Sequence, residues 1–363
     1  MQVFTADKVF TGFDWLPDHA IVTQNGRIED LLPIVSLSPN LVITNHSYMI
    51  IPAFIDIQIY GADGKLFATS PTKETLRAMY NHCISGGTNN FLPTIATNSL
   101  EVVKKAINAI KNYWGDDGKG VVGLHMEGPW INKIKKGAHE EDFIHAPSLT
   151  EVMEIIGYGD GVIKMITLAP ECCPDDIIAF IRSKEIVISI GHSNASFTEA
   201  TQAFNNGIYL ATHLFNAMSP FHHRDPGIPG AVIQHPQVMA SIVADGYHVN
   251  FEVINIVKRL MRQRLFLITD AVTETSTGLY QHKYEGDKYT HHETLSGSSL
   301  SMLKAATNCI KKAGISEQEA LRMASHYPAK VLGLDYRLGL IKKGYDAELT
   351  FLDSEWLISN HPI

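Results

Sequence analysis

Short apolar runs alternate with longer amphipathic segments through most of the chain. Apolar runs of this length are typical of buried strands, and amphipathic segments between them are typical of helices. Strands that alternate with helices predict a parallel sheet. Eight runs occur in about 220 residues, and a (β/α)8 barrel has eight such units in ~250 residues. The runs are Ile50–Ile59, Thr88–Leu92, Val121–Met126, Ile163–Leu168, Ile186–Ile190, Ile208–Thr212, Val238–Ala244 and Leu265–Thr269.

The segments between and after these runs have the amphipathic pattern of helices. The segment Thr273–Glu293 is different, because it is polar and has no clear period, and we expect an irregular loop there. The expected helices include Lys73–Ser85, Leu100–Tyr113, Pro174–Ser183, Ser196–Asn206, Asn250–Met261, Ser298–Ala313 and Ser316–Leu332.

Both ends of the chain depart from the alternating pattern. Met1–Phe10 and His19–Leu32 contain strand-like stretches, and Asn25-Gly26 is a strong signal for a tight hairpin turn. Gly339–Asp353 returns to strand character near the other end. We therefore expect a (β/α)8 barrel over residues 50–335 and a small β-sandwich domain built from residues 1–49 and 336–363.

The amino-acid composition limits which kinds of partner and which cell compartment are expected. The net charge is -8, so nucleic acid is not expected as a partner, although a few placed cations suffice to bind one phosphate. The sequence shows no apolar stretch long enough to cross a membrane, and from its first residues we expect no signal peptide. Its four cysteines lack CxxC spacing, which indicates neither a disulfide framework nor a zinc knuckle. A reduced, cytoplasmic setting and a small-molecule substrate are expected.

Polar residues with metal-binding side chains stand at the ends of several predicted strands. Glu127 directly follows the third run, His192 follows the fifth, and His213 follows the sixth. In a (β/α)8 barrel the loops after the strands converge on one face, which carries the active site. One carboxylate and two imidazoles form a three-ligand set that leaves room for water and substrate, as in catalytic zinc sites. Any one of the three alone is more often a solvated or hydrogen-bonded residue, so the hypothesis depends on their combination.

Three further residues have both a chemical and an ordinary interpretation. Asp270 directly follows the eighth run and is a candidate general base beside a metal, or else a helix cap or the acceptor of a structural hydrogen bond. His139, in the loop after Glu127, is a candidate donor to a substrate carbonyl, or else an exposed loop histidine. Arg224, in a loop rich in proline and glycine, is a candidate phosphate ligand, or else a solvated arginine.

Eight sequence motifs occur in the order found in N-acetylglucosamine-6-phosphate deacetylases, which belong to the amidohydrolase superfamily. The resemblance runs from near residue 1 to beyond residue 350. The motifs are GLHMEGPW at 123–130, KKGAH at 135–139, GHSNA at 191–195, THLFNAM at 212–218, DPGIPGA at 225–231, ADGYHVN at 244–250, LITDA at 267–271 and LSGSSLSM at 295–302.

The resemblance implies removal of the acetyl group from N-acetylglucosamine 6-phosphate in amino-sugar catabolism. It implies one divalent metal held by Glu127, His192 and His213, with zinc as the first expectation and iron, manganese or cobalt as other ions that such a set accepts. It implies Asp270 as catalytic base and acid. It also implies a homodimer in which Arg224 reaches the phosphate in the neighbouring site. Further substrate contacts are implied for Ala138, His139, Asn216, Ala217, His248, Leu295, Ser296 and Gly297, and we expect Gln58 to face the substrate.

The end of the first predicted strand distinguishes this chain from other amidohydrolases. Many of them have His-x-His there, which supports a second metal, whereas this chain has Gln58 and Tyr60. A neutral amide is a poor metal ligand and a phenol an uncommon one, so a single metal is expected. The missing His-x-His also argues against a cyclic-amide hydrolase. A deacetylase of another sugar phosphate, such as N-acetylgalactosamine 6-phosphate, stays open, and so does a non-catalytic metal-binding or regulatory barrel protein.

Overall fold

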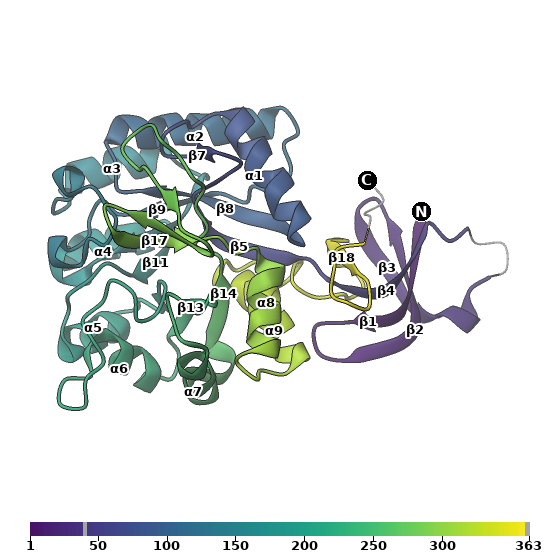
Figure 1. Ribbon diagram of the computed structural model, residues 1–363. Helices are drawn as coiled ribbons and strands as arrows, with labels where there is room; N and C mark the ends of the chain where they lie inside the picture. Colours follow the sequence, from purple (N-terminus) through teal and green to yellow (C-terminus); the bar gives the residue numbers. More distant parts are fainter. Residues whose placement is uncertain (39–41, 360–363) are drawn as a thin grey trace.

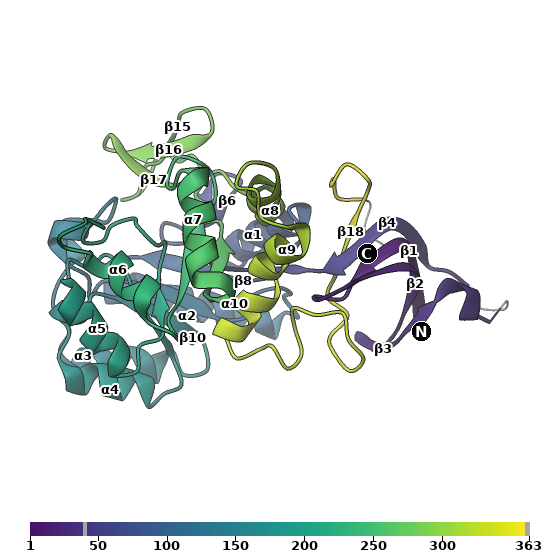
Figure 2. The same ribbon diagram turned by 90° about the horizontal axis from the view of Figure 1, so that it is seen from below.

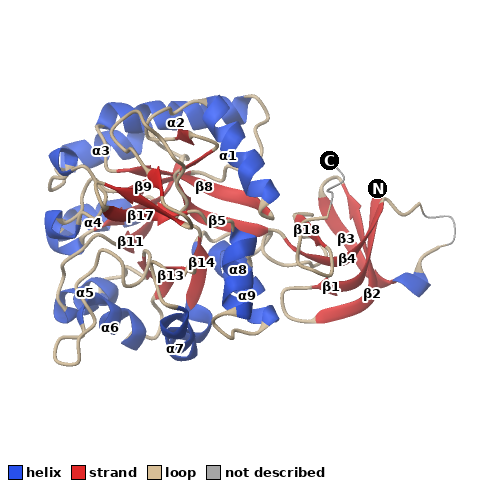
Figure 3. Ribbon diagram, viewed as in Figure 1, coloured by secondary structure: helices blue, strands red, loops and turns tan. Residues whose placement is uncertain are grey.

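Eight parallel strands form the centre of the molecule. The computed structural model describes residues 1–38 and 42–359. The strands lie in the order β14-β13-β12-β11-β10-β9-β8-β5, with helices around the outside (Figure 1, Figure 3). The predicted (β/α)8 barrel is confirmed. The strands are β5 (Phe54–Ile59), β8 (Thr88–Ala96), β9 (Leu124–Glu127), β10 (Ile163–Leu168), β11 (Val187–Ile190), β12 (Leu210–Ala211), β13 (Met239–Val243) and β14 (Leu265–Ile268).

Helices cover the outer face of the barrel, and several of them begin at polar caps. The side chains of Thr72, Ser99, Ser148, Ser196 and Asn250 each accept a backbone N–H in the first turn of the helix that follows. The helices are α1 (Lys73–Ser85), α2 (Leu100–Gly115), α3 (Leu149–Tyr158), α4 (Asp175–Arg182), α5 (Phe197–Asn205), α6 (Gly227–Gln234), α7 (Phe251–Met261), α8 (Met302–Lys311), α9 (Glu317–Ala324) and α10 (His326–Val331). Short 3-10 turns occur at Ile34–Ser36, Lys133–Lys135, Glu141–Phe143, Pro170–Cys172 and Arg262–Arg264.

The barrel closes between β5 and the end of β14. The Asp270 N–H donates to the Gln58 carbonyl over 2.9 Å, and the Tyr60 N–H donates to the Ala271 carbonyl over 2.9 Å. One level below, the buried Asp56 carboxyl accepts the backbone N–H of Thr269 over 3.2 Å and bonds to its hydroxyl. The strand ends that carry Gln58 and Asp270 are therefore held side by side.

The two ends of the chain meet in a separate five-stranded sheet with the order β18-β4-β1-β2-β3, seen at the right of Figure 1. Leu349 of β18 pairs antiparallel with Pro52 of β4. A small apolar core that includes Phe4, Ile21 and Phe351 stabilises this sheet. Its strands are β1 (Gln2–Phe10), β2 (Trp15–Gln24), β3 (Arg27–Pro33), β4 (Asn45–Pro52) and β18 (Leu349–Leu352).

The run Ile50–Ile59, expected as one strand, is divided between two sheets. It breaks at Ala53, so that β4 pairs in the small sheet while β5 pairs in the barrel. All of its residues are buried. The apolar run is continuous because both sheets need buried side chains, and so it carries no signal for the change of sheet.

The segment Thr273–Glu293, expected as an irregular loop, instead contributes to a three-stranded antiparallel sheet. We call residues 283–298 the flap; it contains β15 (Lys283–Tyr284), β16 (Lys288–His291) and β17 (Thr294–Ser298). The flap lies over the barrel end that faces the viewer in Figure 1 and projects at the top of Figure 2. A second small ribbon, β6 (Gly61–Ala62) with β7 (Lys65–Leu66), follows β5.

Two findings bear on the expectations from composition. All four cysteines are free thiols. Within residues 1–38 and 42–359 we find no helix that is both long enough and apolar enough to cross a membrane.

The buried Asp56 at the closure of the barrel leads to a prediction about stability. Burial raises the pKa of Asp56 to about 7, from an ordinary value of 3.8. Because the folded protein holds this proton more tightly than the unfolded chain, the free energy of unfolding should fall as the pH rises from about 4 through about 7. Asp56→Asn is always neutral and keeps the oxygen that accepts the Thr269 N–H. Denaturant titrations from about pH 5 to pH 8 should show a flatter pH profile for this variant than for the wild type.

The matched control is Asp160→Asn, since Asp160 is exposed. It should keep the wild-type profile. Parallel profiles for wild type and Asp56→Asn would remove Asp56 as the source of the pH dependence.

Candidate active site

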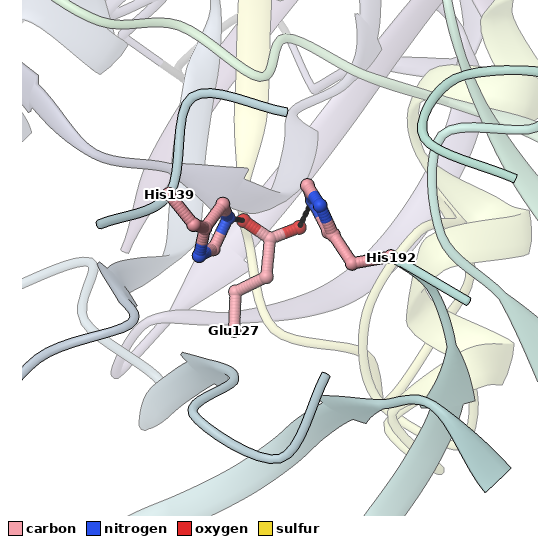
Figure 4. Close-up of side chains that lie close together, drawn as sticks. All are labelled: Glu127, His139 and His192. Carbon is pink, nitrogen blue, oxygen red and sulfur yellow. Dashed lines mark hydrogen bonds and ion pairs between the residues drawn. The ribbon is translucent and has the colours of Figure 1, made fainter. Parts of the chain in front are cut away.

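The centre of the site is the carboxylate of Glu127, the last residue of β9, which is 1% exposed. Its Oε2 lies 3.1 Å from His139 Nε2, and its Oε1 lies 3.1 Å from His213 Nε2 and 3.4 Å from His192 Nε2. Figure 4 shows the carboxylate between His139 and His192. Burial opposes ionisation, but the nearby His192 and the hydrogen bonds from His139 and His213 hold the Glu127 pKa well below its ordinary value.

His192 and His213 are brought to this carboxylate by an unusual backbone. They follow β11 and β12, and both have positive φ, 48° and 35°. Asp270, after β14, has φ of 54°. Few residues other than glycine adopt this conformation, and such strain clusters at functional sites. Three of the four residues that the sequence singled out therefore share the same strained turn at a strand end.

One ring nitrogen of His192 carries no proton and faces the cluster. Its Nδ1 lies 2.9 Å from the Lys135 carbonyl, which can only accept, so Nδ1 carries a proton. In the neutral ring Nε2 is then a lone-pair donor. It lies 3.1 Å from His213 Nε2. A backbone carbonyl that orients a ring in this way is typical of histidines that bind metals.

His139 has the opposite tautomer. Its Nδ1 accepts the backbone N–H of Thr97 over 3.2 Å, so the ring proton is on Nε2, which faces Glu127. Burial lowers the pKa of His139 to about 4, with the neighbouring His192 as the next cause. His139 is therefore a neutral hydrogen-bond donor aimed into the site, although its Nε2 is close enough to be counted with potential ligands.

Gln58 and Tyr60 occupy the place of a second metal pair at the end of β5. The Gln58 amide donates to Glu127 Oε1 over 2.9 Å and to Asp270 Oδ1 over 2.8 Å. The Tyr60 hydroxyl donates to Glu127 Oε2. Both side chains act as donors to carboxylates, and this arrangement supports the expectation of a single metal.

Asp270 lies beside this cluster and is buried. Burial raises its pKa, and the charge of His213 acts against that rise. A carboxyl group with a raised pKa is suited both to take up a proton and to give it back. No described helix begins at Asp270, so the alternative of a helix cap does not apply.

The donor set fits a small divalent cation. Glu127 Oε1, His192 Nε2 and His213 Nε2 form a triangle with sides of 3.1, 3.1 and 3.4 Å. Ligands at 2.0–2.1 Å from a tetrahedral ion lie roughly 3.3 Å apart, so the spacing matches zinc-like coordination. Glu127, His139 and His192 also lie within 4.8 Å of one another, but the His139 tautomer makes it a donor and not a ligand.

A cavity of about 220 Å³ opens above the cluster. The cluster forms its floor with Tyr60 and Asp270, and the flap contributes one wall. Most residues expected to contact the substrate line it: Ala138, His139, Asn216, Ala217, His248, Leu295, Ser296 and Gly297. His248 is oriented by Asp245, whose Oδ2 lies 2.6 Å from its Nδ1. Gln58, which was expected to face the substrate, is not among the residues that line the cavity, and its amide instead contacts Glu127 and Asp270.

Arg224 lies outside the cavity of its own chain. It is exposed in the loop between β12 and α6. No lysine or arginine is among the described residues that line the cavity.

Several residues at the site were not expected from the sequence. Thr97 sets the His139 tautomer, and Tyr280 and His282 line the cavity. Burial lowers the pKa of His282 to about 4, and its Nδ1 lies 2.9 Å from the Ser296 hydroxyl. The chain contains seventeen histidines, which is a general signal for metal chemistry, but His282 stands in a polar segment without a period, so nothing local marks it.

Known proteins share both the sequence pattern and the fold of this chain. The Amidohydrolase family model matches residues 49–362. N-acetylglucosamine-6-phosphate deacetylase of Haemophilus influenzae is 31% identical over 94% of this chain and 92% of its own length. N-acetylgalactosamine-6-phosphate deacetylase of Escherichia coli O157:H7 is 29% identical over 97% of this chain and 95% of its own. The crystal structure of N-acetylglucosamine-6-phosphate deacetylase from Pasteurella multocida aligns with a TM-score of 0.93 and 31% identity, covering 98% of this chain and 96% of that one.

The close contact between Gly297 of the flap and Asp270 leads to a prediction about stability. Gly297 has φ of +68°, and a Cβ there would lie 2.8 Å from the Asp270 carbonyl oxygen. Gly286, also in the flap, has φ of +76° and open space around it. Both alanine variants incur backbone strain, but only Gly297→Ala also forces two backbone segments apart. In denaturant titrations Gly297→Ala should lower the free energy of unfolding by about 1–3 kcal/mol more than Gly286→Ala. Equal losses would contradict this packing.

Proposed function

The chain belongs to the amidohydrolase family, and from that membership we propose that it hydrolyses the acetamide of N-acetylglucosamine 6-phosphate to glucosamine 6-phosphate and acetate. The single observation that carries the proposal is the meeting of Glu127, His192, His213 and Asp270 at the floor of one cavity. Three of them match a metal-binding set, and the fourth is a carboxyl group suited to proton transfer.

Glu127, His192 and His213 would hold the ion, with zinc as the first expectation among divalent metals. When bound, such an ion supplies a positive charge that acidifies water and polarises a carbonyl group. Gln58 and Tyr60 keep the Glu127 carboxylate in place through their hydrogen bonds to it.

The remaining roles fall to side chains whose hydrogen bonds are already arranged. Asp270 takes the proton from the attacking water and then gives it to the departing amine nitrogen. The His139 Nε2–H donates to the acetyl oxygen as that atom gains negative charge. Thr97 keeps this proton on Nε2, and because His139 is neutral its proton is not lost to a nearby base. A binding protein would need no such base, which argues against a non-catalytic barrel.

The phosphate of the substrate calls for a cation, and no lysine or arginine is among the described residues that line the cavity. Arg224 is exposed on a loop close in sequence to Asn216 and Ala217, which line the cavity. We propose a homodimer in which Arg224 of one copy binds the phosphate in the site of the other, through paired hydrogen bonds. A cytoplasmic location stays a prediction from the spacing of the cysteines.

A second candidate substrate is N-acetylgalactosamine 6-phosphate. A relative that bears this name aligns over nearly the whole chain at an identity close to that of the glucosamine relative. The two sugars differ only in the configuration of one hydroxyl, far from the acetamide chemistry. Comparing the two in one assay decides between them.

The first test is acetate release from both acetylated sugar phosphates, with metal analysis of the same samples. The wild type should contain a divalent metal and release acetate, fastest from N-acetylglucosamine 6-phosphate. Asp270→Asn should keep the metal and lower kcat by ~10²–10⁴ because proton transfer is lost. Asp160→Asn, far from the site on an exposed turn, serves as the control and should match the wild type. Full activity of Asp270→Asn would contradict the assignment of Asp270 as the catalytic base and acid.

The second test concerns the phosphate. Arg224→Ala should raise KM for the phosphorylated sugar far more than for its unphosphorylated form, because only the former has the anion. Arg259→Ala, an exposed arginine of α7, should change neither. Light scattering should give the mass of a dimer. Equal effects of Arg224→Ala on both sugars would remove it from the phosphate site, and a monomeric active enzyme would exclude the shared site.

A further inference from the structure

A second cluster of metal-binding side chains lies outside the catalytic cavity, where the flap meets the loop after β9. Glu140, His291 and His292 each place one possible ligand atom within 4.8 Å of the others. His291 ends β16, and His292 follows it in the two-residue turn before β17. Glu140 follows His139 in the loop after β9. The flap that carries the two histidines projects at the top of Figure 2.

His291 is oriented as a ligand. Its Nδ1 lies 3.1 Å from the Gln281 carbonyl, so Nδ1 carries a proton and Nε2 is free to bind. This Nε2 lies 3.2 Å from Glu140 Oε1. Two ligands of one tetrahedral ion lie roughly 3.3 Å apart, so the spacing suits a shared ion. The His291 side chain is 4% exposed and that of Glu140 is 30% exposed, so the pair is shielded from water on one side only.

His292 supplies the third group from the solvent side. It is exposed, and its ring centroid lies 4.2 Å from that of His291. Its φ is 46° and that of Glu293 is 64°. A turn with two positive φ values normally contains asparagine or glycine, and here it contains two residues with ligand side chains.

We propose that Glu140, His291 and His292 bind a second divalent ion of the zinc class, separate from the catalytic ion. One carboxylate and two imidazoles are a set that zinc favours, and the exposed side leaves room for water as a further ligand. A simple ion pair between Glu140 and protonated His291 is the competing interpretation. That pair has no use for His292, so His292 distinguishes the two.

Such an ion would tie the flap to the loop that carries His139. His291 also packs near Tyr280 and His282, with ring centroids 6.0 and 5.9 Å from its own, and both of these line the catalytic cavity. Holding Glu140 and His291 together therefore holds one wall of the cavity beside the loop of the His139 donor. The ion is predicted to reduce the opening of the flap without entering the reaction.

The experiment counts ions in the full chain. Protein stripped with a chelator is dialysed against Zn²⁺ buffered at low micromolar free concentration, and bound zinc per chain is measured by mass spectrometry. The wild type should bind two ions. Glu127→Gln should lose the catalytic ion and keep the other, while Glu140→Gln and His292→Asn should each bind one. Asparagine suits the positive φ of residue 292, so the turn is kept while the imidazole is removed.

His223→Asn is the matched control, because His223 is exposed and its ring lies 4.1 Å from that of His222, so it tests whether any pair of surface histidines binds zinc. It should still bind two ions, and Glu127→Gln/His292→Asn should bind none. A Glu127→Gln protein that binds no ion, or a His292→Asn protein that binds as many ions as the wild type, would overturn the proposal.

Backbone hydrogen exchange tests the consequence for the flap. In Glu127→Gln, which leaves only the second site, added Zn²⁺ should slow exchange of the flap amides, residues 283–298. In Glu127→Gln/His292→Asn it should change nothing. Exchange that is equally fast with and without bound zinc in Glu127→Gln would contradict the tie between flap and loop.

Discussion

A buried negative charge at Glu127 is the constraint on which the rest of the site depends. A carboxylate that is 1% exposed is stable only when donors surround it. Here the polar partners come from several elements: Gln58 and Tyr60 from the end of β5, His139 from the loop after β9, His192 from the end of β11 and His213 from the end of β12. The barrel therefore assembles a charge that no single element could bury.

The contacts that close the barrel between β5 and β14 also involve the residues of the proposed reaction. Gln58 donates to Glu127 and Asp270 through its side chain, while its carbonyl accepts the Asp270 N–H that helps to close β14 on β5. Asp56 holds Thr269 one level below. A shift of β14 relative to β5 would move the proposed base, Asp270, relative to the proposed metal ligands. The strained backbone at His192, His213 and Asp270 is kept in place by this surrounding network.

Most of the barrel could be predicted from sequence because its strands and helices differ in period. Run Ile163–Leu168 and segment Lys73–Ser85 match β10 and α1 in both bounds. The flap was missed because its strands are short and polar, and only their pairing makes them strands. The division of Ile50–Ile59 between two sheets was missed because a run buried on both faces does not alternate. Both failures concern which segments pair, and local pattern does not record pairing.

The candidate site divides in the same way. The sequence by itself determined which strand ends carry Glu127, His192, His213 and Asp270, because a polar residue directly after an apolar run is visible without a structure. Only the tertiary structure decided what each one does there. Thr97 makes His139 a donor, Lys135 makes His192 a candidate ligand, and Gln58 meets Asp270 across 212 residues of chain. The position of a proton on a ring depends on the partner of the other nitrogen, and that partner is supplied by folding.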